Sequence, residues 1–361
     1  MLNVHFYLRL GKLALINLFL WLLLLFYNSN KKGYSNNYIF SGLIILAFAT
    51  FAFSEADTYH YREIYDQMIL YHEPIHVESF YYWLIEFLPH NYYLWRMVVW
   101  GISLCLLIFT YKRYRLNSNT LESVFAIILL QEFVVTRGCL GISLFLFSIS
   151  LFSIPLRKKV VSYILGFLGV VVSVFLHQSL PIFILIFLFT CIPFRKSTIL
   201  LSLILFPIIR VGLLPYVSEL LSTGLFSSET MDFASSYLED DKSVANTNGL
   251  IRQVIELLPF FLMFILLVVE YVFRQKYIER SVKILFKYSY VLFYIAMLFL
   301  GQQTSSFISS RTIHMMCFPL VIVVANYIST TKRQNWLLNT SLVFFCIADV
   351  FAFLYTIYKT W

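Results

Sequence analysis

Charged side chains are scarce in this sequence. They make up 13% of its 361 residues, whereas 60% are hydrophobic and the mean hydropathy is +0.78. A soluble protein carries roughly 25% charged residues, so the composition excludes an ordinary soluble enzyme. Apolar runs of about 17–25 residues recur along the whole chain, which is the length that a helix needs to cross a bilayer. We therefore predict an all-α, polytopic integral membrane helical bundle that forms a single transmembrane domain over residues 1–361.

Paired cysteines are also missing. The five cysteines are widely separated and form no CxxC motif; they are Cys105, Cys139, Cys191, Cys317 and Cys346. This spacing excludes a disulfide framework and the usual zinc motifs. We expect the cysteines to be small buried apolar residues, and we expect no metal and no cofactor.

A cleavable signal peptide is not expected either. Arg9 and Lys12 precede an apolar run from Leu13 to Phe26, but no small-x-small cleavage pattern follows that run. We therefore expect the run to remain as the first membrane span.

The apolar runs predict about twelve transmembrane helices. We place them at residues 10–27, 38–53, 91–110, 120–136, 138–156, 160–176, 179–194, 197–214, 252–273, 284–300, 312–330 and 336–358. The run 197–214 is unusual because it contains Pro207 and Arg210.

The net charge is +8, and the positions of the basic residues indicate how the chain is oriented in the membrane. Most Lys and Arg residues fall in short clusters on one side of the predicted bundle, and such clusters face the cytoplasm. Both termini are then outside the cytoplasm, and we expect no nucleic-acid partner. All seven His residues fall on the opposite side or at its membrane edge. Two long external loops are predicted, at residues 54–90 and 213–251, and loops of this length are usually functional or disordered.

The first long loop begins with the sequence FSEADTYHYREIYDQ, residues 53–67. The Ser54-x-x-Asp57 spacing fits a helix capping box. The tyrosines and apolar residues that follow recur every three or four positions, which predicts an amphipathic helix at the membrane surface. The segment fits either an interfacial anchor or the edge of a binding site; Asp57, Tyr59 and Tyr61 are its candidate site residues. The later stretch 78–95 is aromatic and is broken by Pro89, which fits a re-entrant or interfacial helix.

Two ionisable residues interrupt apolar sequence in the middle of the chain, namely Arg137 and His177. An arginine at this depth is costly unless it is paired or solvated, and its planar fork suits phosphate oxygens. A salt bridge with Glu132, or snorkelling of the arginine to the membrane interface, is the alternative. His177 can accept a proton near neutral pH, or it can be a buried histidine that is hydrogen bonded to the backbone or to Ser179.

A third ionisable residue, Arg311, opens a late span after a run of hydroxyl and amide side chains. Cations and hydroxyls at a helix N-terminus are typical of an anion site. His314 lies one turn further along the same helix face, and Arg210 and Arg252 flank the second long loop. The predicted spans bring Arg137, His177, Arg311 and Asp57 to one leaflet, which favours a polar, anion-binding cavity at the outer face.

The order of these motifs resembles the EpsG/Wzy-like polysaccharide polymerases, which include O-antigen polymerases. The motifs that carry the resemblance are ADTYHY (Asp57, Tyr59, Tyr61), VTRGCLGIS (Arg137), FLHQSLP (His177, Ser179) and SSRTIHMMCF (Arg311). The resemblance covers nearly the whole chain. Two departures from the family pattern are Gly138 after the arginine and the sequence SEAD at the first aspartate.

This resemblance implies a metal-independent glycosyltransferase in the bacterial inner membrane, with its site facing the periplasm. It would transfer a glycan from an undecaprenyl-pyrophosphate carrier to the non-reducing end of another lipid-linked repeat unit. Arg137 and Arg311 would bind the pyrophosphate, and His177 or Asp57 would be the base. Tyr59, Tyr61, Arg210, Arg252 and His314 would contact substrate. A separate chain-length regulator commonly accompanies such enzymes.

Other classes of membrane protein share parts of this pattern. A lipid-linked oligosaccharide flippase also has about twelve spans, but a transporter places its ionisable residues near the bilayer midplane and often has repeated halves. In this sequence the charges gather at one leaflet, and we find no repeat. An O-antigen ligase or a membrane acyltransferase is the alternative among enzymes.

Overall fold

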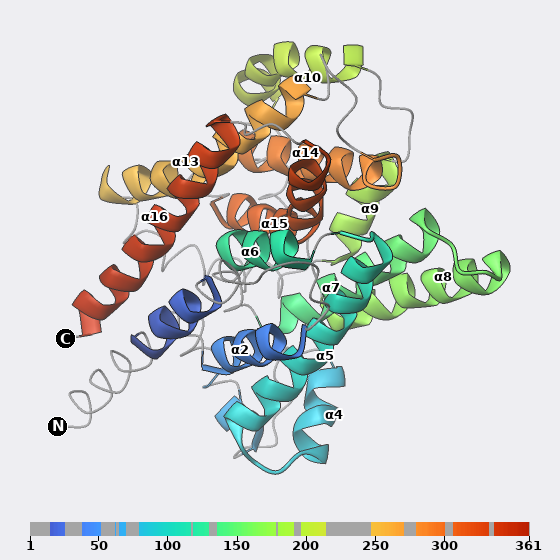
Figure 1. The fold of residues 1–361 in the computed structure, drawn as a ribbon, viewed down its shortest axis with the longest axis vertical. Coiled ribbons are helices and arrows are strands. Elements are labelled where there is room, and N and C mark those ends of the chain that lie inside the picture. The colour runs from blue at the N-terminus through green and yellow to red at the C-terminus, as the bar shows by residue number, and fades with distance from the viewer. Residues whose placement is uncertain are drawn as a thin grey trace.

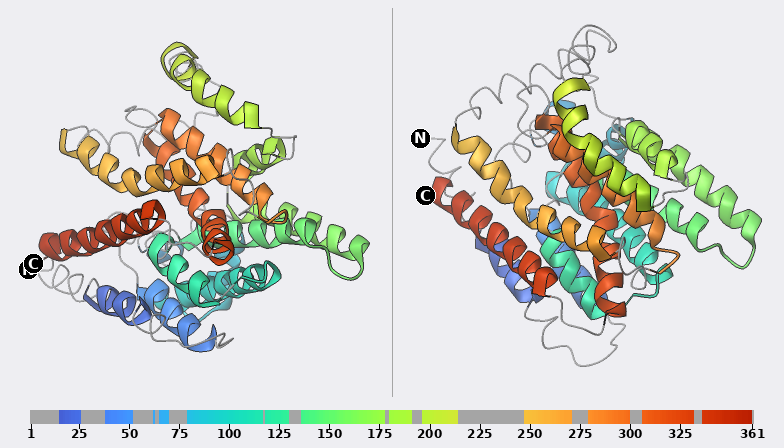
Figure 2. Two further views of the ribbon diagram at one scale, coloured as in Figure 1. Left: turned by 45° about the horizontal axis from the view of Figure 1, so that its top comes forward. Right: turned by 90° about the horizontal axis from the view of Figure 1, so that it is seen from above.

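A computed structural model describes residues 15–25, 38–51, 62, 65–69, 79–116, 118–129, 136–177, 180–190, 196–213, 247–270, 279–299, 306–331 and 336–360. Within these ranges the chain is almost entirely helical and has no strand. The protein is therefore an all-α bundle, as the apolar runs predict. In the right-hand view of Figure 2, most of the helices run along one common direction.

Helices account for nearly all of the described residues. The first half of the chain forms α2 (Tyr38–Phe51), α4 (Ser79–Phe87), α5 (Tyr92–Arg113), α6 (Ser118–Ile128), α7 (Thr136–Ser153) and α8 (Lys159–Leu176). The second half forms α9 (Leu180–Thr190), α10 (Lys196–Ile208), the π-helix η2 (Ile209–Leu213), α13 (Thr247–Val269), α14 (Lys283–Phe299), α15 (Ser306–Thr330) and α16 (Trp336–Thr360). Another apolar helix covers Leu15–Leu25.

Three helices in the described ranges are long and apolar enough to cross a bilayer: Tyr92–Arg113, Lys159–Leu176 and Thr312–Thr330. Several shorter apolar helices lie beside them, so the count of twelve spans stays a prediction. Three predicted helix ends differ clearly from the structure. Helix α6 ends at Ile128 and not at residue 136, α13 begins at Thr247 and not at residue 252, and α15 begins at Ser306 and not at residue 312. Arg311 therefore lies in the second turn of α15 and does not open it. The run that contains Pro207 is helical and passes into η2, where the π-turn follows the proline.

Helical residues lie within the first predicted loop, 54–90. They are residues 65–69 and helix α4. Asn91 then caps α5, because its side-chain oxygen accepts hydrogen bonds from the Tyr93 and Leu94 backbone N–H groups at 3.0 and 3.2 Å. Most of the second predicted loop, 213–251, lies outside the described residues.

Helix α15 lies in the middle of the bundle (Figure 1). Its residues from Met315 to Ala325 are buried on all sides, which a helix surrounded by other helices requires. It packs against α14, α6 and α7. At the α14–α15 junction the Ser309 hydroxyl donates to the Ala296 carbonyl at 3.0 Å.

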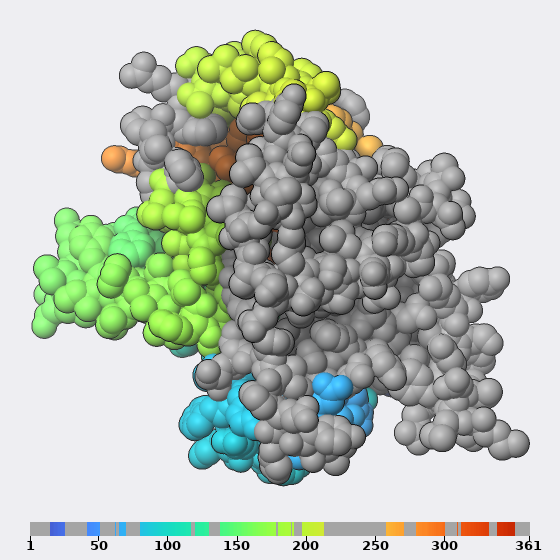
Figure 3. Space-filling view, turned by 180° about the vertical axis from the view of Figure 1, so that it is seen from behind, coloured from blue at the N-terminus to red at the C-terminus, as the bar shows by residue number. Residues whose placement is uncertain are grey.

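Helices α8 and α10 lie at the edge of the bundle and protrude in Figure 3. Their exposed side chains are apolar, which fits contact with lipid and not with water. On α8 the large exposed residues are Val160, Val161, Tyr163, Ile164, Leu165, Phe167, Leu168, Val171, Val172 and Phe175. On α10 they are Leu200, Leu201, Leu203, Ile204, Leu205 and Ile208.

Helices α5 and α7 run side by side in the same direction. The Arg113 guanidinium, at the last residue of α5, donates to the carbonyls of Ser150 and Ile154 where α7 ends. We call this the Arg113 end of the bundle and the opposite one the His177 end. The charge pattern predicts that the Arg113 end faces the cytoplasm.

Helices α7 and α8 approach closely because small residues lie between them. A side chain added at Gly166 would meet the Phe152 ring at 2.9 Å, and one added at Gly169 would overlap the Ser148 hydroxyl. Small residues let two membrane helices come together, and packing then replaces the hydrophobic effect as the source of stability. This contact determines the position of Leu176, the C-terminal residue of α8.

We therefore expect Gly169→Val to destabilise the bundle by about 1–3 kcal/mol, which is the usual cost of overpacking. The measurement is the midpoint of thermal unfolding in detergent. Gly101→Val on α5 is the matched control, because no atom lies within 4 Å of a side chain added there. An equal melting temperature for the two variants would contradict the close α7–α8 contact.

Candidate functional site

His177 terminates helix α8. Its backbone is extended (φ −159°, ψ 126°), and α9 begins three residues later with a Leu180 N–H to His177 carbonyl hydrogen bond at 3.0 Å. Pro181 falls in the first turn of α9, where its missing N–H costs nothing. The break in the helix turns the His177 side chain into the bundle, and 8% of the residue is exposed.

Gly141 on α7 makes room for this turn. A side chain added at this position would lie 2.5 Å from Leu180 Cδ1, 3.4 Å from His177 Cβ and 3.5 Å from Leu176 Cβ. The close approach of the helix and the turn therefore depends on glycine. It sets the depth at which the imidazole enters the bundle.

A second histidine reaches the same place from α15. His314 is buried, with 6% exposure, and its ring packs edge to face on Phe318 with centroids 5.5 Å apart. Its Nε2 lies 3.9 Å from Cys139 Sγ on α7. The thiol is a weak hydrogen-bonding group, so this contact orients the ring without fixing its charge.

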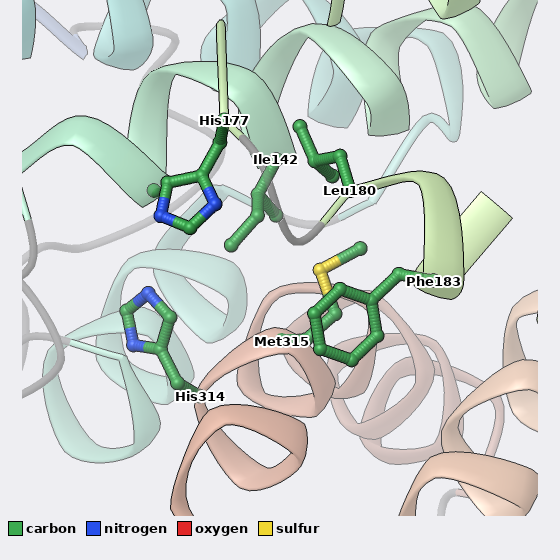
Figure 4. Close-up of a pocket in the computed structure, with 7 residues that line it drawn as sticks. Ile142, His177, Leu180, Phe183, His314 and Met315 are labelled. Carbon is green, nitrogen blue, oxygen red and sulfur yellow. The ribbon is translucent and has the colours of Figure 1, made fainter. Parts of the chain in front are cut away.

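The two imidazoles face each other across one pocket (Figure 4). Its lining comes from α7, the α8–α9 junction, α9 and α15, and consists of Gly138, Ile142, His177, Leu180, Phe183, His314 and Met315. The histidines supply its polar side, and the remaining walls are apolar. The cavity has room for about one water molecule. One hydroxyl group or one water can therefore lie between the rings, but a whole sugar cannot.

The backbone positions of two predicted arginines lie close to this pocket. Arg137 is the second residue of α7 and directly precedes Gly138, which lines the pocket. Arg311 lies on α15, three residues before His314. Their side chains lie outside the described part of the structure. The backbone alone thus brings the helix positions of both arginines to the His177 end.

The other predicted residues are distributed differently. Arg210, in η2, donates to the Met297 carbonyl of α14 at 2.7 Å and is not part of the pocket lining. Arg252 lies on α13, and its side chain is outside the described residues. Asp57, Tyr59 and Tyr61 lie outside them entirely. Within the described ranges, no group of three or more His, Cys, Asp or Glu residues could hold a metal ion.

Sequence reasoning missed two residues near this site. Cys139 is buried, as predicted, but its contact with His314 follows only from the fold. Arg96 is completely buried in α5, beneath aromatic residues that pack on α7. Its signal was visible in the sequence, because a charge inside an apolar span is a functional candidate in its own right.

The Gly141 contact generates a prediction about His177. We expect Gly141→Val to push the Leu176–Leu180 turn away from α7 and to expose the imidazole. The rate at which diethyl pyrocarbonate modifies His177, followed by mass spectrometry, should then rise severalfold, whereas Gly101→Val should leave it unchanged. An unchanged rate in a folded Gly141→Val protein would show that the turn tolerates a side chain.

Comparison with protein families identifies the chain. The EpsG family matches residues 35–361. Comparisons with curated proteins and with solved structures give no match. The match begins before α2 and includes every helix described after it, so it covers the pocket and all of the predicted site residues. With its all-α bundle and its apolar spans, this chain is a membrane protein that belongs to the EpsG family.

Proposed function

We propose that this protein is a surface-polysaccharide polymerase. In this proposal it transfers a growing glycan from an undecaprenyl-pyrophosphate carrier to the non-reducing end of another lipid-linked repeat unit. The reaction takes place in the bacterial inner membrane, with the site facing the periplasm. Membership of the EpsG family supports the general role of a polysaccharide polymerase. The substrate, the mechanism and the orientation are our proposals.

The observation that carries this proposal is the histidine pair. A cavity with room for one hydroxyl is enclosed by apolar walls and has an imidazole on either side. Gly138, the residue after Arg137, is part of the lining, and Arg311 is about one helical turn before His314. A site that combines a base for a hydroxyl with nearby cations suits transfer to an alcohol from an anionic leaving group.

The proposed reaction forms one bond and breaks one bond. The acceptor hydroxyl oxygen attacks the anomeric carbon of the donor, while the bond from that carbon to the pyrophosphate oxygen breaks. His177 takes the hydroxyl proton, a step that general-base catalysis accelerates by about 10²–10⁴-fold. Asp57 is the second candidate for this base. Arg137 and Arg311 stabilise the negative charge that develops on the departing pyrophosphate.

His314 takes a different role from His177 in this scheme. From the other side of the cavity it accepts or donates one hydrogen bond to the acceptor hydroxyl and so orients the attacking oxygen. Cys139 and Phe318 hold its ring in place. Correct orientation of two reactants contributes to the rate independently of proton transfer.

The proposal also includes two partners, which are the bilayer and a second protein. Lipid-linked oligosaccharides reach the site from the membrane, and the apolar surfaces of α8 and α10 are in contact with lipid. A separate regulator of chain length is the proposed protein partner. We propose no nucleic-acid partner, no metal and no cofactor.

The function is tested by deleting the gene and complementing it with variants. We expect deletion to collapse the polysaccharide ladder on a gel to a single repeat unit. Wild type should restore the ladder, whereas His177→Ala, Arg137→Ala and Arg311→Ala should not. His90→Ala is the matched control and should restore it, because His90 is exposed in the bend between α4 and α5. Expression of each variant is measured by immunoblotting.

Three outcomes of this experiment would contradict the proposal. A ladder that is unchanged by deletion would remove the polymerase function. Loss of every repeat unit would indicate a flippase or a ligase. Restoration of the full ladder by His177→Ala at normal expression would leave polymerisation in place but remove His177 as its base.

The orienting role generates a separate prediction for His314. We expect His314→Ala to slow polymerisation by at least about tenfold, because loss of one hydrogen bond to a reacting group commonly costs 1.5–3 kcal/mol. His314→Gln keeps a donor and an acceptor and should recover part of the loss. The measurement is the rate of ladder growth in membrane vesicles that contain the cell's own lipid-linked units. Equal rates for wild type and His314→Ala would contradict this role.

A further inference from the structure

Arg96 is a charged residue in the apolar interior that the proposed reaction leaves unused. It lies in the second turn of α5, and only 1% of it is exposed. Its Nε and Nη2 atoms are buried and have no hydrogen-bond partner within the described structure. An arginine cannot lose its charge in a protein, so an unpaired guanidinium inside a membrane bundle is costly. A buried group of this kind needs an explanation in terms of a ligand, a water or a catalytic role.

The neighbours of Arg96 are hydrogen-bond donors. Its guanidinium lies beside the hydroxyl of Tyr92, one turn earlier on α5. Neither that hydroxyl nor Trp95 Nε1 has a further partner in the described ranges. The nearby Tyr65 cannot supply negative charge, because burial and the carboxylate of Asp66 raise the pKa of its hydroxyl above 10.0. One face of α5 thus presents several N–H and O–H groups together, and no carboxylate is among them.

Arg96 lies at the same end of the bundle as the histidine pocket. The hydrogen bond from Arg113 to the carbonyl of Ile154 shows the register of α5 on α7. Arg96 precedes Arg113 by 17 residues, and Arg137 precedes Ile154 by 17 residues. The two parallel helices rise about 1.5 Å per residue, so the backbones of Arg96 and Arg137 lie at nearly the same height.

The packing of the helices agrees with this register. Val99 and Leu140 belong to one buried cluster, and each lies three residues beyond its arginine. The same cluster contains Leu176, which directly precedes His177. Arg96 is therefore about one helical turn from a cluster that also contains the residue before the candidate base.

We propose that Arg96 belongs to the anion site of this protein and that its Nε–H and Nη2–H bind phosphate oxygens of a lipid-linked diphosphate. This inference rests on the proposed function and adds a residue to it. A guanidinium fork matches a phosphate group with two parallel hydrogen bonds, which accounts for Nε and Nη2 donors that lie together without a partner in the described ranges. The positive end of the α5 dipole adds to the attraction for an anion.

The surface above Arg96 offers a route to it. Arg62 lies over the Tyr92 ring, with its guanidinium carbon 5.6 Å from the ring centroid, and its side chain is 52% exposed. Arg62 also pairs with Asp66 at 3.5 Å, which is a weak, solvent-screened interaction. A diphosphate that approaches from the His177 end meets Arg62 first. Rotation of the Tyr92 ring then opens the way to Arg96.

The test is binding of the purified full-length protein in nanodiscs to three probes. They are a polyprenyl diphosphate, inorganic pyrophosphate, and phosphatidylglycerol as an anionic lipid headgroup. Affinity is read from the rise in melting temperature with ligand concentration, which needs no polymerase activity. We expect the polyprenyl diphosphate to stabilise the wild type more than phosphatidylglycerol does. Pyrophosphate alone should stabilise it at higher concentration.

The variants separate binding by Arg96 from a merely structural role. We expect Arg96→Gln to weaken binding of the diphosphate by at least about tenfold, and Arg96→Lys to weaken it less, because lysine keeps the charge and loses the fork. If Arg96→Gln does not fold, Arg96→Lys is compared with wild type in its place. Arg113→Gln is the matched control on the same helix. It should lower the melting temperature without ligand and leave the affinity unchanged.

The outcomes distinguish this inference from the proposed function. Equal affinity of wild type, Arg96→Gln and Arg96→Lys for the diphosphate would overturn the role of Arg96 and leave the polymerase proposal intact. Equal stabilisation by phosphatidylglycerol and by the diphosphate would show a general headgroup site and would also overturn it. A wild type that binds no diphosphate at all would overturn both.

Discussion

A polar side chain inside a bilayer has to find its partners within the bundle, and this requirement distinguishes Arg113 and Arg210 from Arg96. Arg113 and Arg210 donate to backbone carbonyls near the ends of neighbouring helices, so their charges hold α7 and α14 in place. Arg96 has buried Nε and Nη2 donors that meet no carbonyl in the described part of the chain. The first two arginines account for the packing of the helices, and the unpaired donors of Arg96 point to a ligand that arrives from outside the chain.

Helix α7 is the element on which the site depends most. It runs parallel to α5 and packs on α8, and Gly141 allows the Leu176–Leu180 turn to approach it closely. Its first turns carry Arg137, which belongs to the proposed anion site, and Gly138, which lines the pocket. They also carry Cys139, which contacts His314, and Gly141, which faces the His177 turn. A small shift of α7 would therefore move the proposed base and the proposed anion site together. The packing of α7 against the Leu176–Leu180 turn therefore sets the position of the histidine.

The sequence predicts the helices well because each needs only a run of apolar residues. It predicts helix ends less well, since these depend on tertiary contacts: α6 ends at Ile128 although apolar residues continue beyond it. His177 and His314 were both identified from the sequence as candidate site residues. That they face each other across one cavity was not predicted, because α15 is distant in sequence from His177. Arg96 was overlooked because apolar residues surround it, which is the feature that makes its charge significant.

The size of the pocket has a consequence for specificity. Because it admits about one hydroxyl, the histidine pair can recognise the attacking oxygen but not the sugar that carries it. A diphosphate likewise has the same chemistry whatever glycan is attached to it. In the proposed reaction, the base and the arginines therefore provide catalysis that is independent of the sugar. Selection between sugars has to come from residues beyond the pocket, and a change in those residues could alter the polymer while the buried machinery stays the same.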